Sequence, residues 1–226
     1  MMVTRQAKIC GLSTEETVIA AINAGANYVG FVFYPPSPRN ISIESAQNLA
    51  SLVSEDVKKV GVFVNPKDEL LLSVLAKVDL DIIQLHGNES VERIQYLQQR
   101  FSKKIMKAVA IASVSDISRA REYEKTADML LFDAKAPKDL ENALPGGNGL
   151  QFDWTLIAGN QWKIPWMLSG GLDASNVAQA VHISGAMTVD VSSGVENEPG
   201  NKDIKKIKSF MAALLASKNA SINESE

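Results

Sequence analysis

Short apolar runs alternate with longer amphipathic or polar segments along the whole chain. Runs rich in β-branched and aromatic residues favour buried strands, and the longer segments between them favour helices. This pattern predicts eight strands, at residues 7–10, 28–33, 59–64, 81–87, 105–111, 129–133, 165–168 and 187–191. A segment with helical character follows each of them.

Capping signals locate several of the helices. Ser13-Thr14-Glu15-Glu16 predicts a capping box before a helix that stops at Gly25, and Ser42 predicts the N-cap of the second helix. Asn65-Pro66 predicts a cap and a first-turn proline for a third helix ending near Val78. The remaining helices are expected at residues 91–101, 115–125, 174–183 and 203–215, with a short one starting at residue 153.

Eight βα units in a row predict an α/β fold of the (βα)8 or TIM-barrel class, formed by a single domain over residues 1–226. The length of 226 residues suits one such barrel, and no change in composition marks a linker. A doubly wound open sheet is the alternative, but no strand is followed by G-x-G-x-x-G or by a phosphate-binding loop ending in G-K-[ST]. Residues 134–152 are expected to form a mobile lid, and residues 218–226 a disordered tail.

Composition narrows the possible partners. The formal net charge of −3 and the pI near 5.5 argue against general binding to nucleic acid or to an anionic membrane. No apolar run reaches the roughly 20 residues of a membrane span, and no signal-peptide pattern occurs, so a cytoplasmic protein is expected. Cys10, the only cysteine, cannot form an internal disulfide, and no Cys/His cluster has structural-zinc spacing, so no metal is expected.

At two places a predicted strand runs directly into serine and glycine. Residues 187–191 lead into Ser192-Ser193-Gly194, and residues 165–168 lead into Ser169-Gly170-Gly171. Such sequences provide backbone N–H groups, hydroxyl donors and a chain that a ligand can approach closely. In an eight-stranded barrel the loops after the seventh and eighth strands are a common phosphate site. These six residues are therefore predicted to bind phosphate, with ordinary turns as the alternative.

The carboxyl ends of barrel strands carry most working residues, and here they present an acid and a potential base. Asp133 directly follows a buried apolar run, where desolvation favours the protonated acid; a helix cap or an ion pair is its alternative role. Cys10 ends the first strand beside Gly11 and shortly before a helix N-terminus, which favours a thiolate; a small core residue is its alternative role.

Three further polar residues are candidates for substrate contact. Arg39 lies on a stiff proline-rich loop and can hold a carboxylate through two parallel hydrogen bonds, although most loop arginines are only solvated. His86 ends the fourth strand and Asp190 lies late in the eighth, and the histidine can instead do no more than satisfy the core. His182 is not a candidate, because it lies near a helix C-terminus on the outer ring.

Six motifs follow one another along nearly the whole chain. They are Lys8-Ile9-Cys10-Gly11-Leu12; Gly30-Phe31-Val32-Phe33 with Ser37-Pro38-Arg39; Gln84-Leu85-His86-Gly87; Gly146-Gly147-Asn148-Gly149 with Phe152-Asp153-Trp154; Leu168-Ser169-Gly170-Gly171-Leu172; and residues 189–196. In this order they resemble the phosphoribosylanthranilate isomerase family, which performs an Amadori rearrangement in tryptophan biosynthesis. Asn148 stands where Ser or Thr is more usual in that family, a difference that does not touch the predicted chemistry.

The resemblance implies a role for each candidate. Asp133 would protonate the furanose ring oxygen, and Cys10 would remove the proton from sugar carbon 2. Arg39 would hold the anthranilate carboxylate, and the two Ser/Gly loops would hold the phosphate. No cofactor is expected, because an isomerisation of this kind requires only an acid and a base. The substrate would be a phosphorylated aminosugar, and a monomer is expected, with a dimer left open.

Three other functions remain open at this point. A Schiff-base aldolase on the same barrel would use Lys107 in the fifth strand as its amine. A metal-dependent sugar-phosphate epimerase is less favoured, because the chain has 2 histidines and His182 is misplaced for ligation. A catalytically silent sugar-phosphate binding protein would lose the acid and base, whereas Cys10 and Asp133 are both present.

Overall fold

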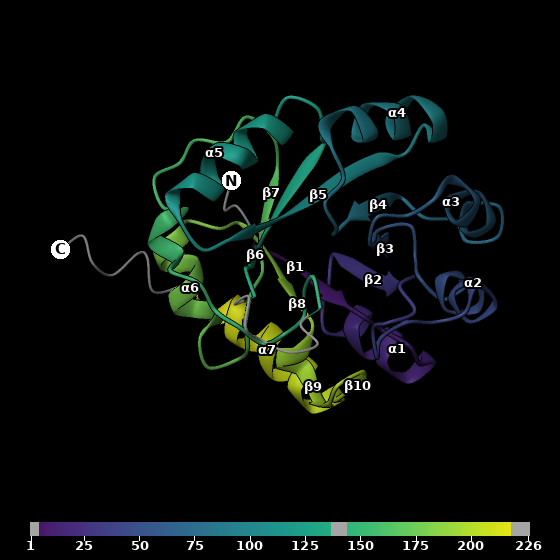
Figure 1. Cartoon of the computed structure of the whole chain (residues 1–226). Coiled ribbons are helices and arrows are strands. Elements are labelled where there is room, and N and C mark those ends of the chain that lie inside the picture. The colour runs from purple at the N-terminus through teal and green to yellow at the C-terminus, as the bar shows by residue number, and fades with distance from the viewer. Residues whose placement is uncertain (1–4, 137–143, 218–226) are drawn as a thin grey trace.

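Eight parallel strands close into a barrel in which each strand pairs with the next along the chain (Figure 1). The computed structural model describes residues 5–136 and 144–217. The strands are β1 (Gln6–Cys10), β2 (Tyr28–Val32), β3 (Lys58–Phe63), β4 (Ile82–Leu85), β5 (Lys104–Ile111), β6 (Met129–Ala134), β7 (Trp166–Leu168) and β8 (Thr188–Val191). Asp190 of β8 lies opposite Lys8 of β1 where the circle closes. All eight predicted strands are confirmed, and so is the (βα)8-barrel fold.

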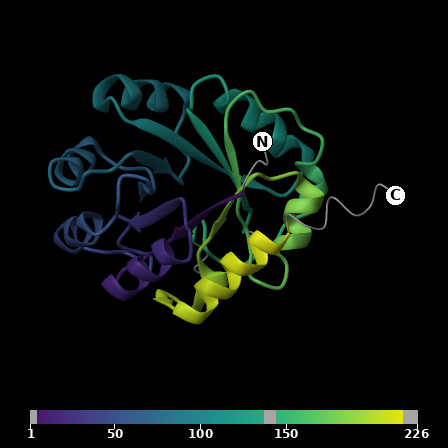
Figure 2. The same cartoon turned by 180° about the vertical axis from the view of Figure 1, so that it is seen from behind.

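In the described parts of the chain, helices follow seven of the strands and lie outside the barrel (Figures 1 and 2). They are α1 (Glu15–Asn23), α2 (Ile43–Ser51), α3 (Asp68–Leu75), α4 (Val91–Phe101), α5 (Val114–Tyr123), α6 (Val177–Ser184) and α7 (Ile204–Ala216). The short 3-10 helix η1 (Trp154–Leu156) lies between β6 and β7. None of these helices combines the length and apolar character that a membrane span requires.

Two predicted helix caps differ in the structure, one by a single position and one because of a tertiary contact. The N-cap of α1 is Thr14 rather than Ser13, and its hydroxyl accepts a hydrogen bond from the Thr17 N–H at 3.4 Å. Asn65 does not cap α3, whose N-cap is Lys67. Its side chain instead accepts a hydrogen bond from the Asn88 N–H at 2.8 Å, which ties together the loops after β3 and β4. The predicted cap at Ser42 is confirmed, since its hydroxyl accepts from the Ser45 N–H at 3.0 Å.

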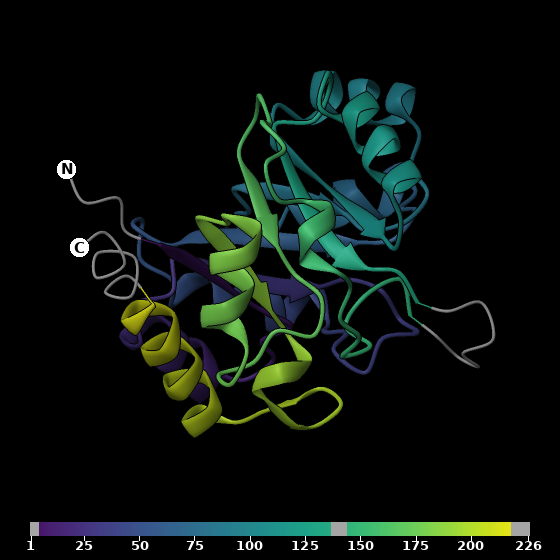
Figure 3. The ribbon, with the colours of Figure 1, turned by 90° about the vertical axis from the view of Figure 1, so that its left-hand side faces the viewer.

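The chain after β8 contains structure that the sequence pattern did not predict. A second 3-10 helix, η2 (Ser193–Val195), leads into an antiparallel hairpin of β9 (Glu196–Glu198) and β10 (Asn201–Lys202). Figure 3 shows this hairpin at the lower edge of the molecule, from where the chain runs back into α7, which packs beside α6 on the outer surface. The hairpin therefore carries the chain away from the barrel mouth while keeping its first and last residues close to it.

The barrel interior is divided into an apolar part and a polar mouth. Inward-facing side chains of the consecutive strands β3 to β7 fill the part nearer the amino ends of the strands, in the cluster Val60, Ile82, Met106, Ala108, Met129, Leu131 and Met167. A larger apolar cluster joins the outward faces of the strands to the helices. The carboxyl ends of the strands carry the polar side chains that face the pocket, among them Arg39, Asp133 and Asp190, which is where a site can form.

Two predictions concern residues outside this description. The predicted tail at residues 218–226 lies outside the described residues, and so do residues 137–143 of the predicted lid. The described remainder of that segment is residues 134–136 and 144–152, of which Ala134 and residues 144–150 line the pocket at the barrel mouth.

Candidate active site

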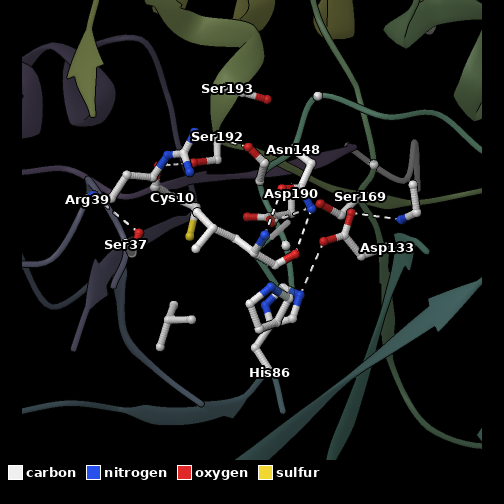
Figure 4. Close-up of a pocket in the computed structure, with 18 of the residues that line it drawn as sticks. Cys10, Ser37, Arg39, His86, Asp133, Asn148, Ser169, Asp190, Ser192 and Ser193 are labelled. Atoms are coloured by element: carbon white, nitrogen blue, oxygen red, sulfur yellow. Dashed lines mark hydrogen bonds and ion pairs between the residues drawn. The ribbon is translucent and has the colours of Figure 1, made fainter. Parts of the chain in front are cut away.

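A pocket opens at the carboxyl ends of the strands and gathers most of the predicted site residues (Figure 4). Ten of the eleven candidates line it, namely Cys10, Arg39, His86, Asp133, Ser169, Gly170, Gly171, Asp190, Ser192 and Ser193. They are brought together because parallel strands in a barrel all end at the same rim. Gly194 does not line the pocket. A Cβ at this position would lie only 1.9 Å from the Leu172 carbonyl oxygen, so the glycine lets the loops after β7 and β8 touch.

Asp133 at the end of β6 is the inner member of a hydrogen-bonded chain. One carboxyl oxygen accepts from the Ala134 N–H at 2.8 Å, and the other lies 3.2 Å from His86 Nε2. On its far side, the His86 ring places Nδ1 3.1 Å from the Gln84 amide nitrogen. If the Gln84 amide nitrogen donates to Nδ1, then Nε2 carries the proton and donates to an ionised Asp133. If the amide is reversed, its oxygen accepts from Nδ1, and a protonated Asp133 donates to Nε2. This series of hydrogen bonds is therefore compatible with either protonation state of the Asp133 carboxyl group.

Cys10 and Lys8 point to the same side of β1, because residues two apart along a strand share a face. A Cβ on Gly30 of the neighbouring strand would lie 2.9 Å from Cys10 Sγ and 3.2 Å from Lys8 Cε, so the glycine makes room for both side chains. The pKa of the Cys10 thiol lies above its ordinary value, because burial raises it more than the Lys8 ammonium lowers it. The ammonium groups of Lys8 and Lys202 are therefore nearby features that favour the thiolate.

Lys8 is itself fully buried and balanced by Asp190. Its ammonium lies 2.8 Å from one Asp190 oxygen, and the Ser169 hydroxyl donates to the other oxygen at 3.1 Å. Burial alone would lower the pKa of Lys8, but the Asp190 carboxylate raises it above its ordinary value. Asp190 thus supports the cation beside Cys10, and its predicted contact with substrate stays a prediction.

Arg39 is held from the side by Glu196. Its Nε and Nη2 donate to the two Glu196 oxygens, each at 2.8 Å, and Nη2 also donates to the Gly147 carbonyl at 3.2 Å. The sequence predicted that this fork would grip a ligand through two parallel bonds. In this conformation that edge is occupied by protein, and Nη1 is the nitrogen for which the described residues supply no hydrogen-bond acceptor.

The two Ser/Gly loops meet beside Cys10 and carry backbone N–H groups that have no acceptor among the described residues. Gly170 has φ +90 and Gly171 φ +59, conformations that strain other residues, and their N–H groups find no acceptor among the described residues. Ser192 is tied in place, since its hydroxyl donates to the Cys10 carbonyl at 3.1 Å. Unpaired backbone N–H groups at adjoining strand ends are a suitable cradle for an anion.

Lys107, the amine of the aldolase alternative, serves a structural role instead. It is buried, does not line the pocket, and its ammonium donates to Glu89 at 2.7 Å and to the Gly87 carbonyl at 2.6 Å. These contacts anchor the loop that carries His86. A lysine with this surrounding is not available to a carbonyl substrate, so the structure removes the residue on which the aldolase alternative depended.

Sequence reasoning missed several residues that complete the site. Lys8 lies within a quoted motif, and its spacing of two from Cys10 on a strand was a usable signal. Gln84 is similarly spaced from His86. Glu196 ends the last of the six motifs, but no spacing links it or Lys202 to Arg39, because both residues reach the site through the unpredicted hairpin.

A closed barrel that presents a thiol and a carboxyl group in one pocket, beside two strand ends of serine and glycine, has the architecture of a (βα)8-barrel enzyme. Residues 7–213 match the family model described as N-(5'phosphoribosyl)anthranilate (PRA) isomerase. The chain belongs to this family, and it is an isomerase.

Relatives and solved structures agree with this assignment. The N-(5'-phosphoribosyl)anthranilate isomerase of Rhodospirillum centenum is 52% identical over 211 residues, which cover 93% of this chain and 98% of the relative. That of Paramagnetospirillum magneticum is 49% identical over 208 residues, covering 92% and 96%. The crystal structure of phosphoribosyl anthranilate isomerase from Thermotoga maritima superimposes with a TM-score of 0.83 at 37% identity, covering 93% of this chain and 98% of that one. A further isomerase structure, in complex with reduced 1-(o-carboxyphenylamino)-1-deoxyribulose 5-phosphate, gives a TM-score of 0.80 at 36% identity, with coverage of 93% and 98%.

Proposed function

We propose that the chain converts N-(5-phosphoribosyl)anthranilate to 1-(2-carboxyphenylamino)-1-deoxyribulose 5-phosphate, with Asp133 as the general acid and Cys10 as the general base. The observation that carries this assignment is that the two side chains line one pocket from β6 and β1, which are not neighbours in the barrel. A sugar held between them can be protonated at one atom and deprotonated at another. Family membership supports the reaction itself.

The first step opens the sugar ring. Asp133 gives its proton to the furanose oxygen, the bond from that oxygen to carbon 1 breaks, and the anthranilate nitrogen supplies the electron pair that forms a carbon–nitrogen double bond. The chain through His86 and Gln84 can hold Asp133 in the protonated form that this step needs. Positioned acids of this kind accelerate reactions by roughly 10²–10⁴-fold.

The second step moves the double bond. The Cys10 thiolate takes the proton from carbon 2, the electron pair forms a bond between carbons 1 and 2, and the nitrogen regains its lone pair. The resulting enolamine then tautomerises to the ketose, with a proton added at carbon 1 and one lost from the hydroxyl on carbon 2. Substrate and product have the same atoms, so the sequence of steps needs no oxidant or reductant. Lys8 supports the thiolate through its positive charge.

Binding of both anionic ends would fix the sugar between acid and base. We infer that the loops at Ser169–Gly171 and Ser192–Ser193 take the phosphate, since the Gly170 and Gly171 N–H groups find no acceptor among the described residues, and that Arg39 takes the anthranilate carboxylate through Nη1. His86 and Asp190 are assigned to the pocket wall around the sugar. We further infer a single domain, a monomer with a phosphorylated aminosugar as its partner, and a location in the cytoplasm.

The direct test supplies purified protein with phosphoribosylanthranilate and follows the loss of its fluorescence. Turnover that is abolished in the Cys10→Ala and Asp133→Asn variants supports the assignment. Binding of substrate without turnover by the unmodified protein would instead indicate the silent binding protein considered above.

A further inference from the structure

A buried triad of charged side chains lies beside the pocket, outside the acid and base. Glu196 receives both hydrogen bonds from Arg39 on one side and the ammonium of Lys202 on the other. The exposed fractions are 5% for Arg39, 7% for Glu196 and 7% for Lys202, so all three charges are shielded from water. Shielded charges hold a fixed geometry only when they are paired, and here one carboxylate joins two cations.

Lys202 also holds the phosphate-binding loop proposed above. Its ammonium donates to the Ser192 carbonyl at 3.0 Å and contacts the Ser192 hydroxyl at 3.1 Å. That hydroxyl donates in turn to the Cys10 carbonyl at 3.1 Å. One lysine therefore contacts the loop after β8 directly and reaches Arg39 through Glu196.

The charge of the triad suits an anionic ligand. The pKa of Glu196 lies below its ordinary value, because its bonds to Arg39 and Lys202 outweigh burial. Burial lowers the pKa of Lys202, and the Glu196 carboxylate opposes that effect. With all three groups charged, the triad carries one positive charge in excess, which a bound carboxylate or phosphate can balance.

We propose that Lys202 is a positioning residue for both anion subsites, and that Glu196 is a positioning residue for the carboxylate subsite alone. Glu196 occupies the Nε–Nη2 edge of Arg39 and so turns Nη1 toward the pocket. Lys202 fixes Glu196 from behind and the loop at Ser192 from the side. This assignment rests on the proposed function, because it takes the carboxylate and phosphate subsites as given there.

The assignment predicts a pattern that a purely structural role would not produce. Binding of anthranilate alone and of inorganic phosphate alone is measured by NMR titration for the unmodified protein and three variants. Glu196→Gln keeps the shape and removes the charge, and should weaken anthranilate about tenfold while leaving phosphate within about twofold. Lys202→Met should weaken both ligands about tenfold.

Lys206→Met is the matched control. The Lys206 ammonium donates to the backbone carbonyl of Glu196 and does not join the triad, so its removal loosens the same strand without changing the charge chain. Both ligands should bind this variant as they bind the unmodified protein. Glu196→Gln is nearly isosteric and carries the test by itself if Lys202→Met does not fold.

Equal weakening of both ligands in Glu196→Gln, or unchanged binding of both in Lys202→Met, would overturn the assignment. So would an unmodified protein that binds neither ligand. Turnover of phosphoribosylanthranilate is measured on the same samples. The expected binding pattern without turnover would leave this assignment standing and reject the proposed reaction, whereas turnover without the pattern would do the reverse.

Discussion

The ammonium of Lys8 lies 2.8 Å from a carboxylate oxygen of Asp190, across the seam where β1 meets β8. Cys10 follows two residues later on the same face of β1. The two charges act on the thiol in opposite directions, since Lys8 lowers its pKa and Asp190 raises it. Substituting either residue should therefore shift the pKa of the Cys10 thiol without altering the thiol itself.

Replacing Lys8 with Met should shift the rising limb of the pH–activity profile to higher pH. Activity that depends on a thiolate rises as pH passes through the thiol pKa, and loss of Lys8 raises that pKa. At neutral pH kcat/KM should fall at least about tenfold. The variant should also lose about 3–5 kcal/mol of stability, because Asp190 is left buried and unpaired. The pH profile of kcat/KM and a urea titration measure the two effects.

Replacing Asp190 with Asn is the opposing control for that experiment. It also breaks the buried ion pair and should also destabilise the protein, yet loss of the Asp190 charge should move the thiol pKa, and with it the pH profile, to lower pH as long as Lys8 stays protonated. A profile that moves the same way in both variants would mean that Lys8 and Asp190 act only through the fold.

Replacing Cys10 with Ala or Asp133 with Asn should lower kcat by roughly 10²–10⁴-fold and leave KM similar. Asp133→Asn keeps the shape of the side chain and removes the proton that opens the ring. Steady-state kinetics give both constants, and circular dichroism shows whether each variant is folded. A folded variant that keeps kcat within about threefold of the unmodified protein would exclude that residue from the chemistry.

Replacing Arg39 with Lys should raise KM nearly as much as replacing it with Ala. The guanidinium bonds both Glu196 oxygens and still has a nitrogen for the ligand, whereas a single ammonium cannot meet both demands. KM values for the two variants are compared under the same conditions. If the lysine variant matches the unmodified protein, positive charge alone suffices and the geometry of the fork is irrelevant.

Replacing Gly171 with Ala should raise KM, because the added Cβ would lie 2.8 Å from the Leu150 carbonyl oxygen and displace the wall of the proposed phosphate site. Gly159→Ala is the matched control. Gly159 also has a positive φ, +70 against +59, but nothing lies within 4 Å of its added Cβ. Each substitution should cost about 1 kcal/mol through backbone strain. An equal rise in KM for both variants would place the phosphate elsewhere.

The sequence alone determined the barrel and the position of its chemistry. Eight apolar runs separated by helical segments predict alternating strands and helices, and without a G-x-G-x-x-G or G-K-[ST] loop this order favours a (βα)8 barrel over a doubly wound open sheet. Once that order is fixed, a residue at a strand's carboxyl end must lie at the mouth, so Cys10, His86 and Asp133 could be placed together from their positions along the chain. The cap at Ser42 was also predicted correctly, because an N-cap depends on residues only a few positions away.

The tertiary structure decided which partners the charged groups have. Glu196 lies 157 positions from Arg39, and no periodicity links two residues at that separation. Glu196 lies in β9, a strand of three residues that pairs with the two residues of β10. Strands this short leave no recognisable pattern in the sequence. At Asn65 a long-range bond overrides a local prediction. Its side chain bonds to Asn88, 23 positions away, instead of forming the helix cap that its neighbours predicted. Local bonds are encoded in short sequence spacing, whereas long-range bonds depend on which loops the closed barrel brings into contact.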